Sequence, residues 1–243
     1  MRWGVVTFPG SNDDHDALHA LSHALGEEAV SLWHKNSDLK GADAILLPGG
    51  FSYGDYLRCG AMARFSPVMA KVVEFAEHGG LVMAVCNGFQ IACEAGLLPG
   101  ALIRNRGLKF VSADVGVRVE NTDTPFTGQC TKGEVLSLPI KHGEGCYVAE
   151  EETLRALEDN GQVVFRYVDS SGRATAHGNP NGSLNNIAGI VNRRRNVLGM
   201  MPHPEHATEK LLGNEDGLKL FRSVVDAVRT GLRAPAASVV PGP

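Results

Sequence analysis

Short apolar runs alternate with amphipathic stretches along the first hundred residues of the chain. The apolar runs are rich in β-branched residues, which is typical of strands, and they fall at residues 3–8, 29–33, 43–47 and 81–85. The stretches between them carry apolar residues at helical spacing, which predicts helices over residues 13–25, 67–78 and 87–95. Because the strands are apolar throughout, we expect an α/β fold with a largely parallel central sheet that helices cover on both faces.

The second half of the chain has a less regular pattern. Its predicted strands lie at residues 111–119, at 162–167 and twice within 188–201. An amphipathic helix over residues 215–230 closes the pattern. No linker divides the body, so we predict a single domain over residues 1–233. Residues 234–243 are rich in Pro and Ala and show no periodicity, so we predict a mobile C-terminal tail there.

Composition narrows the class of protein. The chain has 243 residues, of which 43% are hydrophobic and 21% charged, so it can form a sizeable core. The net charge of −4 argues against a mainly electrostatic nucleic-acid binder, because phosphate contacts need clustered positive charge. No apolar run approaches the roughly 20 residues needed to cross a bilayer. We therefore expect a soluble, cytoplasmic protein that binds neither nucleic acid nor membrane.

The cysteine pattern favours neither disulfides nor a metal site. The number of cysteines is odd, their spacing is irregular, and no Cys or His pair has the spacing of zinc ligands. Most of the five are therefore interpreted as small buried hydrophobic residues: Cys59, Cys86, Cys93, Cys130 and Cys146. No metal ligands are predicted.

One cysteine lies at the predicted carboxyl end of a parallel strand, where sheets of this kind usually carry their functional residues. Ligands collect at the carboxyl ends of parallel strands, and Cys86 directly follows the apolar run 81–85 and precedes a predicted helix. Ala84 and Gly88 supply the small residues that a tight nucleophile elbow requires. The start of the helix would also favour the thiolate form of Cys86. The alternative is a buried cysteine that only packs at a strand end.

A second candidate group lies late in the chain. A cysteine nucleophile needs a base, and the base needs a carboxylate that orients it. His203 and Glu205 lie two residues apart, with Pro202 and Pro204 keeping the segment extended, so both side chains can lie on one side. The alternative for this segment is a rigid surface turn.

The third candidate feature is the glycine pair that follows the run 43–47. Two glycines after a strand allow backbone N–H groups to point into the crevice, as an oxyanion hole requires. The predicted donors are the backbone N–H groups of Gly50, Phe51 and Asn87. A plain strand-ending turn is the alternative, since a glycine pair alone is a weak signal.

These residues belong to motifs that closely resemble those of the class I (triad) glutamine amidotransferases. The motifs are FPGSN at 8–12, LPGGFSYGDYLRCGAMA at 47–63, VCNGFQ at 85–90, HGEG at 142–145, NPNGS at 179–183 and NVLGMMPHPE at 196–205. They follow one another in the family's order over most of the chain. The resemblance implies a flavodoxin-like class I glutamine amidotransferase fold. Within the family, the motifs are most similar to those of a glutaminase subunit of purine biosynthesis.

The resemblance also implies a role for each residue of the triad. Cys86 would attack the side-chain amide of glutamine, His203 would be the base, and Glu205 would orient His203. The γ-glutamyl thioester on Cys86 would then be hydrolysed to glutamate. Gln90, Gly143 and Glu144 would help to form the glutamine pocket.

The expected partners follow from the same resemblance. In this family the ammonia passes to a separate synthetase subunit, where ATP and Mg²⁺ serve to convert formylglycinamide ribonucleotide (FGAR) into its amidine (FGAM). A small third subunit bridges the two. The chain lacks a P-loop, which agrees with ATP chemistry on the partner, and we expect it to bind no cofactor itself.

Three positions depart from the family's motifs. Asp13 stands where cysteine is expected, His206 stands where arginine is usual, and Cys146 stands where arginine or asparagine is common. None of them belongs to the expected triad.

Two other functions remain as alternatives. The first is a stand-alone cysteine hydrolase of the related fold, but such proteins typically place His after the elbow Cys, where this chain has Asn87. The second is a catalytically silent, glutamine-sensing regulatory subunit. The sequence gives no sign that catalytic activity has been lost, because all three residues of the triad are present.

Overall fold

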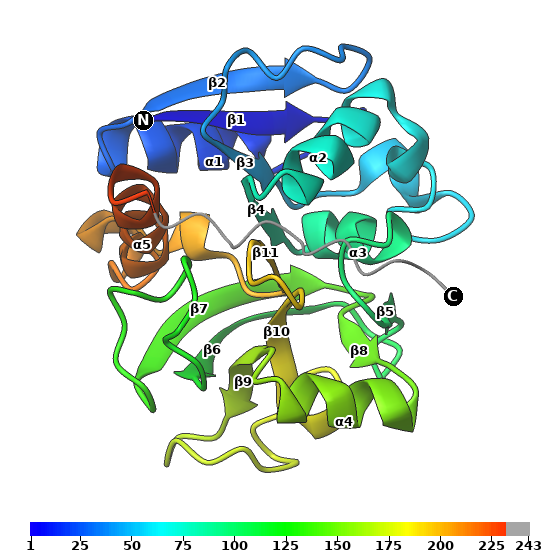
Figure 1. Cartoon of the computed structure of the whole chain (residues 1–243). Coiled ribbons are helices and arrows are strands. Elements are labelled where there is room, and N and C mark those ends of the chain that lie inside the picture. The colour runs from blue at the N-terminus through cyan, green and yellow to red at the C-terminus, as the bar shows by residue number, and fades with distance from the viewer. Residues whose placement is uncertain (232–243) are drawn as a thin grey trace.

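A nine-stranded sheet runs through the molecule, and one half of it is parallel. The computed structural model describes residues 1–231, so the predicted tail at 234–243 lies outside the described residues. The strand order is β2-β1-β3-β4-β11-β10-β9-β6-β7, and the first five strands are parallel to one another. These are β1 (Arg2–Thr7), β2 (Glu28–Trp33), β3 (Ala44–Leu47), β4 (Leu81–Val85) and β11 (Val197–Met200). Figure 1 shows β1 and β2 at one end of this sheet.

Helices follow the parallel strands β1, β3 and β4 along the chain. They are α1 (Asp14–His19), α2 (Pro67–Glu77) and α3 (Asn87–Glu94). In the strand order, the step from β1 to β2 goes toward one edge of the sheet and the step from β3 to β4 goes toward the other. Because both crossovers are right-handed, α1 and α2 lie on opposite faces of the sheet. The helix predicted over 13–25 is present, but its second half, Ala20–Ala24, is a π-helix. The α/β fold predicted from the sequence is confirmed in this half.

The other half of the sheet is antiparallel, which the sequence pattern did not predict. It contains β6 (Val111–Val119), β7 (Val135–His142), β9 (Val163–Val168) and β10 (Ile187–Val191). β7 was not predicted, because a proline within a run argues against a strand, although the buried positions of β7 alternate regularly. Proline lacks the N–H that an inner strand needs, and β7 accommodates it as the outermost strand of the sheet.

The remaining elements are short or lie outside this sheet. β5 (Ala101–Ile103) and β8 (Cys146–Val148) form a two-stranded sheet, and α4 (Glu151–Asp159) covers the lower end in Figure 1. α5 (Leu218–Arg229) packs on β1, where the rings of Phe221 and Trp3 meet edge to face at 6.1 Å. Short 3₁₀ segments lie at Ser52–Asp55, Ala63–Phe65, Leu184–Asn186, Pro204–His206 and Lys210–Leu212.

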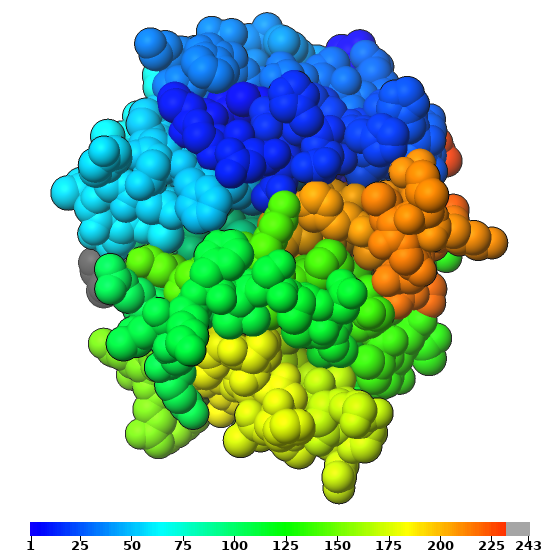
Figure 2. All heavy atoms as spheres, turned by 180° about the vertical axis from the view of Figure 1, so that it is seen from behind, coloured from blue at the N-terminus to red at the C-terminus, as the bar shows by residue number. Residues whose placement is uncertain are grey.

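One edge of the sheet gathers the segments that the sequence analysis singled out. The segments after β1, β3, β4 and β11 leave the sheet at this edge, because these strands are parallel. β7 runs in the same direction as β11, since four antiparallel steps separate them. The C-terminal end of β7 therefore faces the same edge. Seen from behind, the blue N-terminal residues lie between the cyan segment after β3 and the orange segment after β11 (Figure 2).

No helix within residues 1–231 is both long enough and apolar enough to span a membrane.

Candidate active site

Cys86 occupies a strained turn between β4 and α3. Its backbone has φ 51° and ψ −107°, a conformation that residues other than glycine rarely adopt. A Cβ atom at Gly88 would lie 2.7 Å from the carbonyl carbon of Leu47, and closer still to its oxygen. Only glycine therefore fits at position 88, and the turn has the geometry of a nucleophile elbow. The Cys86 side chain is 5% exposed.

His203 and Glu205 lie together after β11. Nδ1 of His203 donates to Oε1 of Glu205 at 2.6 Å, and both side chains are buried. The backbone N–H of His203 donates to the carbonyl of Pro139 on β7 at 2.8 Å. Nε2 of His203 is buried and has no hydrogen-bond partner among residues 1–231. The imidazole is thus fixed on one side and leaves its second nitrogen available.

The electrostatics of His203 favour the imidazolium. Burial lowers its pKa, but the negative charges of Glu205 and of the Cys86 thiolate outweigh burial and raise the pKa to about 10. Cys86 and His203 are therefore close enough to interact through charge. The structure brings together all three residues of the predicted triad.

A cavity of about 210 Å³ opens above Cys86. It is lined by Gly50, Phe51, Asp55, Cys59, Cys86, Gln90, Phe110, Lys141, His142, Gly143 and Glu144. Nε2 of Gln90 donates to the backbone carbonyl of Glu144 at 2.6 Å, and its Oε1 accepts from Nδ2 of Asn87 at 2.8 Å. The three residues predicted from the sequence to form the glutamine pocket, Gln90, Gly143 and Glu144, therefore line one cavity with Cys86.

The predicted oxyanion donors differ in availability. Asn87 is the first residue of α3, so the helix itself leaves its backbone N–H without a partner. The N–H of Gly50 donates to no other group among residues 1–231. The N–H of Phe51 donates to the carbonyl of Gly10 at 2.9 Å and is not free in this structure. Gly50 and Asn87 thus offer the available donors.

The sequence analysis gave no role to a group of charged residues beside His203. Oδ2 of Asp13 lies 3.8 Å from Nδ1 of His203. Oδ1 of Asp13 pairs with Nζ of Lys141 and lies 3.3 Å from Nε2 of His206. In the sequence, Asp13 and His206 stand out only as departures from the family's motifs, and the structure places these two in contact with each other.

Four of these side chains could in principle surround a metal ion. Ligand atoms of Asp13, His203, Glu205 and His206 all lie within 4.8 Å of one another. However, Asp13 already pairs with Lys141, and Glu205 accepts the hydrogen bond from His203. Oε2 of Glu205 and Nε2 of His203 have no hydrogen-bond partner among residues 1–231, but the Asp13–Lys141 and His203–Glu205 pairs already use the facing atoms, and we assign no metal to the cluster.

The other four cysteines lie in surroundings that favour the neutral thiol. Burial raises the pKa of Cys59, Cys93 and Cys146, and it raises the pKa of Cys130 to about 11. The carboxylates of Asp55 and Glu144 raise the pKa of Cys59 further. These thiols are therefore poor nucleophiles at neutral pH.

Comparison with known proteins points to one family. Residues 1–225 match the family model of the CobB/CobQ-like glutamine amidotransferase domain. The phosphoribosylformylglycinamidine synthase subunit PurQ of Chlorobaculum tepidum is 61% identical over 91% of this chain and 94% of that protein. PurQ of Gloeobacter violaceus is 58% identical over 93% of this chain and 97% of that protein.

Solved structures agree with these relatives. The structure of PurLQS from Thermotoga maritima contains a chain that superposes with a TM-score of 0.83 at 44% identity, covering 93% of this chain and 98% of that one. A glutamine amidotransferase from the same organism superposes with a TM-score of 0.59 at 12% identity, covering 94% of this chain and 97% of that one. The second match shows the likeness of the fold alone.

Proposed function

The chain belongs to the PurQ family of phosphoribosylformylglycinamidine synthase subunits, within the glutamine amidotransferases, and from this premise we propose that it is the glutaminase of that synthase. It hydrolyses glutamine to glutamate and ammonia, and it delivers the ammonia to a synthetase subunit that converts FGAR into FGAM. The single observation that carries the mechanism is the strained Cys86 elbow beside the buried His203–Glu205 pair.

In the first step, the Cys86 thiolate attacks the carboxamide carbon of glutamine. The carbonyl π electrons move to oxygen, and the backbone N–H groups of Gly50 and Asn87 stabilise that oxyanion. His203 starts as the imidazolium, which its surroundings favour. The tetrahedral carbon then bears the sulfur, the oxyanion and the amino group.

In the second step, the tetrahedral intermediate collapses. His203 gives its Nε2 proton to the amino group, the C–N bond breaks, and ammonia leaves a γ-glutamyl thioester on Cys86. The neutral His203 then takes a proton from water, and the water oxygen attacks the thioester carbon. The C–S bond breaks, which releases glutamate and restores the Cys86 thiolate beside the imidazolium. Glu205 holds the imidazole through Nδ1 during both steps.

The cavity offers groups for the other end of glutamine. Asp55 and Glu144 line the cavity, and their carboxylates suit the α-ammonium group of an amino acid. Burial, together with the charge of Glu144, raises the pKa of Asp55, while Glu144 itself lies 3.6 Å from Nε of Arg104. Gln90 and Gly143 complete the wall beside them.

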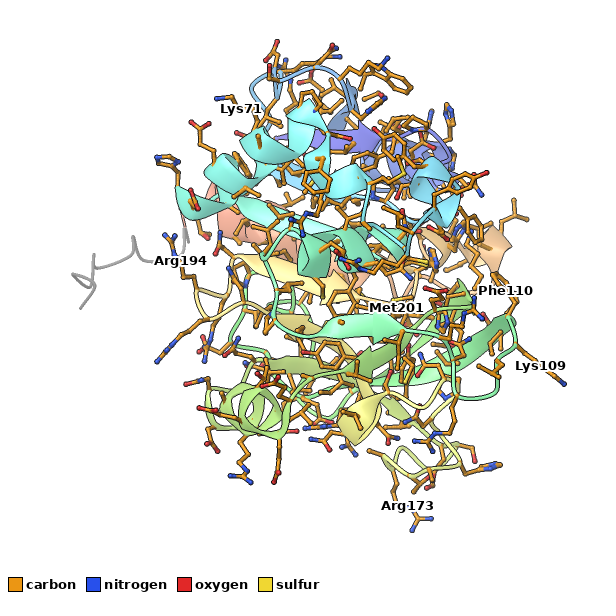
Figure 3. The ribbon with its side chains drawn as sticks, turned by 90° about the vertical axis from the view of Figure 1, so that its right-hand side faces the viewer. Lys71, Lys109, Phe110, Arg173, Arg194 and Met201 are labelled. Carbon is orange, nitrogen blue, oxygen red and sulfur yellow. The ribbon has the colours of Figure 1, made fainter. Side chains whose placement is uncertain are left out.

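Exposed apolar side chains are frequent in the two segments that supply Phe51 and Phe110 to the cavity wall. They come from the segments 51–65 and 103–110, and we call them the apolar rim: Phe51, Tyr56, Leu57, Met62, Phe65, Ile103, Leu108 and Phe110. The rings of Phe51 and Phe110 stack at 6.5 Å, and Figure 3 shows Phe110 at the margin of the molecule. A partner that covers the rim would receive ammonia without losing it to solvent, and apolar patches of this kind are typical of protein interfaces.

We assign this partner as the synthetase subunit PurL, with PurS as the small bridging subunit. The protein from Thermotoga maritima is found in a PurLQS complex, which supports the assignment. ATP and Mg²⁺ then serve PurL, while this chain binds no cofactor of its own. A cytoplasmic location agrees with this role in purine biosynthesis.

Ammonia release from glutamine tests the proposal. We expect weak release by the chain alone and strong stimulation by PurL, PurS, FGAR, ATP and Mg²⁺. Cys86→Ala should reduce glutamine-dependent turnover by at least about 10³-fold, because the nucleophile is lost. Cys130→Ala, a change at a half-buried cysteine outside the cavity, should leave turnover unchanged.

The same assay separates the two alternatives. Strong ammonia release that is the same with and without the partner subunits would indicate a stand-alone hydrolase. Glutamine binding with no release under any condition would indicate a regulatory subunit.

A further inference from the structure

Asp13 is a buried carboxylate that the proposed mechanism does not use. It precedes α1 at the carboxyl edge of the sheet, and it is 2% exposed. Its Oδ2 lies 3.8 Å from Nδ1 of His203, where Glu205 already accepts a hydrogen bond at 2.6 Å. One nitrogen of the imidazole therefore faces two carboxylates.

The backbone at Gly49 is shaped to let Asp13 and His203 approach each other. A Cβ atom at Gly49 would lie 2.7 Å from Cε1 of His203 and closer still to Oδ2 of Asp13. The backbone N–H groups of Asn12 and Asp13 both point to the carbonyl of Gly49, at 3.4 Å. The segment after β3 thus holds Asp13 against His203.

Asp13 keeps its negative charge in this buried place. Burial by itself raises its pKa, but the hydrogen bonds from His206 and Lys141, and the charges of His203 and Lys141, hold the pKa well below its usual range. Lys141 reaches Asp13 from the end of β7, and His206 reaches it from the segment after β11. Two separate elements therefore fix the position of the carboxylate.

The side chains around His203 carry more negative than positive charge. Those that face it, directly or through Asp13, are Glu205, Cys86, Asp13, Lys141, His142 and His206. Burial and the charge of His203 lower the pKa of His142 to about 4, so His142 is neutral. Nε2 of His206 also lies 4.0 Å from Asp16 and 3.8 Å from Glu205.

We propose that Asp13 is a positioning residue for His203, whose buried charge keeps the imidazole protonated while Glu205 sets its orientation. Asp13 touches neither the cavity nor Cys86, so it acts through His203 alone. The inference rests on the proposed glutaminase function, because it assigns a task to the same base. The protonated imidazole is the form that gives its proton to the departing ammonia.

The test is the pH profile of kcat/KM for glutamine, measured with the full chain in complex with its partners. We expect Asp13→Asn to move the alkaline limb about one unit lower than in the wild type, because an opposite charge has been removed beside the imidazolium. We expect kcat/KM to fall about tenfold at pH values above the limb and to change little at neutral pH, where the imidazole stays protonated in both proteins. Asp13→Ser, which is close in size to the cysteine of the family's motif, should shift the limb in the same direction and covers the case in which the amide variant does not fold.

The matched control is Asp14→Asn. Asp14 is also a buried carboxylate, 4% exposed, but it accepts a hydrogen bond from Thr7 at 2.9 Å rather than facing the triad. The alkaline limb should not move in this variant. If both Asp13 variants lose activity with an unmoved limb, Asp13 has only a structural role and the inference is wrong. If the wild-type complex releases no ammonia, the proposed function itself has failed.

Discussion

The backbone N–H of His203 donates to the carbonyl oxygen of Pro139 at 2.8 Å, so the outermost strand of the sheet holds the proposed base. Pro139 lies four steps away from β11 in the strand order, and β7 and β6 curve across the molecule in Figure 1. The curvature of the antiparallel half thus brings β7 back to the carboxyl end of β11. His203 is fixed by this backbone bond and, through Nδ1, by Glu205.

Gly49→Ala should impair catalysis more than folding. The added methyl group would meet both Asp13 and His203, so at least one of these two side chains must move. We expect turnover to fall more than tenfold and the free energy of unfolding to fall by about 1–3 kcal/mol, as for overpacking. Turnover and urea unfolding measure the two effects. Gly107→Ala is the control, since nothing lies within 4 Å of a Cβ there, and unchanged turnover in Gly49→Ala would contradict the prediction.

The stability of the protein should fall at alkaline pH because of His203. Its pKa is raised from 6.5 to about 10 in the folded chain, mainly by Glu205 and Cys86 against the opposing effect of burial. Above pH 6.5 the unfolded chain loses this proton while the folded chain keeps it, so the free energy of unfolding decreases until about pH 10. Below pH 6.5 both states bind the proton and the stabilisation is complete.

Urea unfolding across this pH range measures the effect. The free energy of unfolding of the wild type should fall more steeply than that of His203→Gln, which has no such proton. The comparison removes the contribution of other titrating groups, including the remaining thiols. Parallel curves for the two proteins would show that His203 is not protonated in the folded state.

Leu57→Arg should weaken binding to the synthetase subunit. Leu57 belongs to the apolar rim and is 88% exposed, so an arginine there would place a charge in the proposed interface without disturbing the core. We expect the Kd for the partner to rise about tenfold or more, and the glutaminase activity of the isolated chain to stay the same. Titration calorimetry or analytical ultracentrifugation measures the binding.

A leucine outside the apolar rim provides the control for this variant. Leu211 is 95% exposed and lies in the 3₁₀ segment Lys210–Leu212, which belongs to neither segment of the rim. Leu211→Arg should bind the synthetase as the wild type does. If Leu57→Arg and Leu211→Arg bind the synthetase with equal affinity, the apolar rim is not part of the interface.

A chain that ends at residue 233 should keep the folding and activity of the whole protein. The predicted domain covers residues 1–233, and the closing helix α5 ends at Arg229. We expect the melting temperature and partner-stimulated turnover of the shortened chain to match those of the full chain. A clear loss of either would mean that residues 234–243 belong to the domain or to its interface.

Most of the parallel half could be predicted from the sequence, because its strands are largely apolar runs, of which β3 and β4 are apolar throughout. The same pattern made Cys86 a candidate nucleophile, since it directly follows a uniformly apolar strand and precedes a helix, although a cysteine that only packs would give the same pattern. The antiparallel half was harder to predict. β7 carries Pro139, which argues against a strand, and α4 buries only Leu157, so few apolar residues mark it.

The contacts between distant segments could not be read from the sequence. Lys141 and Asp13 are 128 positions apart, and they meet only because β7 and β1 end at the same edge. The hydrogen bond from Phe51 to Gly10 depends on how the segments after β1 and β3 pair, which residue spacing does not specify. Sequence motifs therefore identified the reacting groups better than the groups that hold them.

The four cysteines outside the triad should not compete with Cys86 for an added electrophile. The pKa values of Cys59, Cys93, Cys130 and Cys146 are all raised, so these thiols stay neutral at neutral pH. A mild electrophile should therefore react with Cys86 alone. The mass added to the intact chain would then equal one label per competent molecule. The wild-type protein can thus be counted by active-site titration, without removing any of its other cysteines.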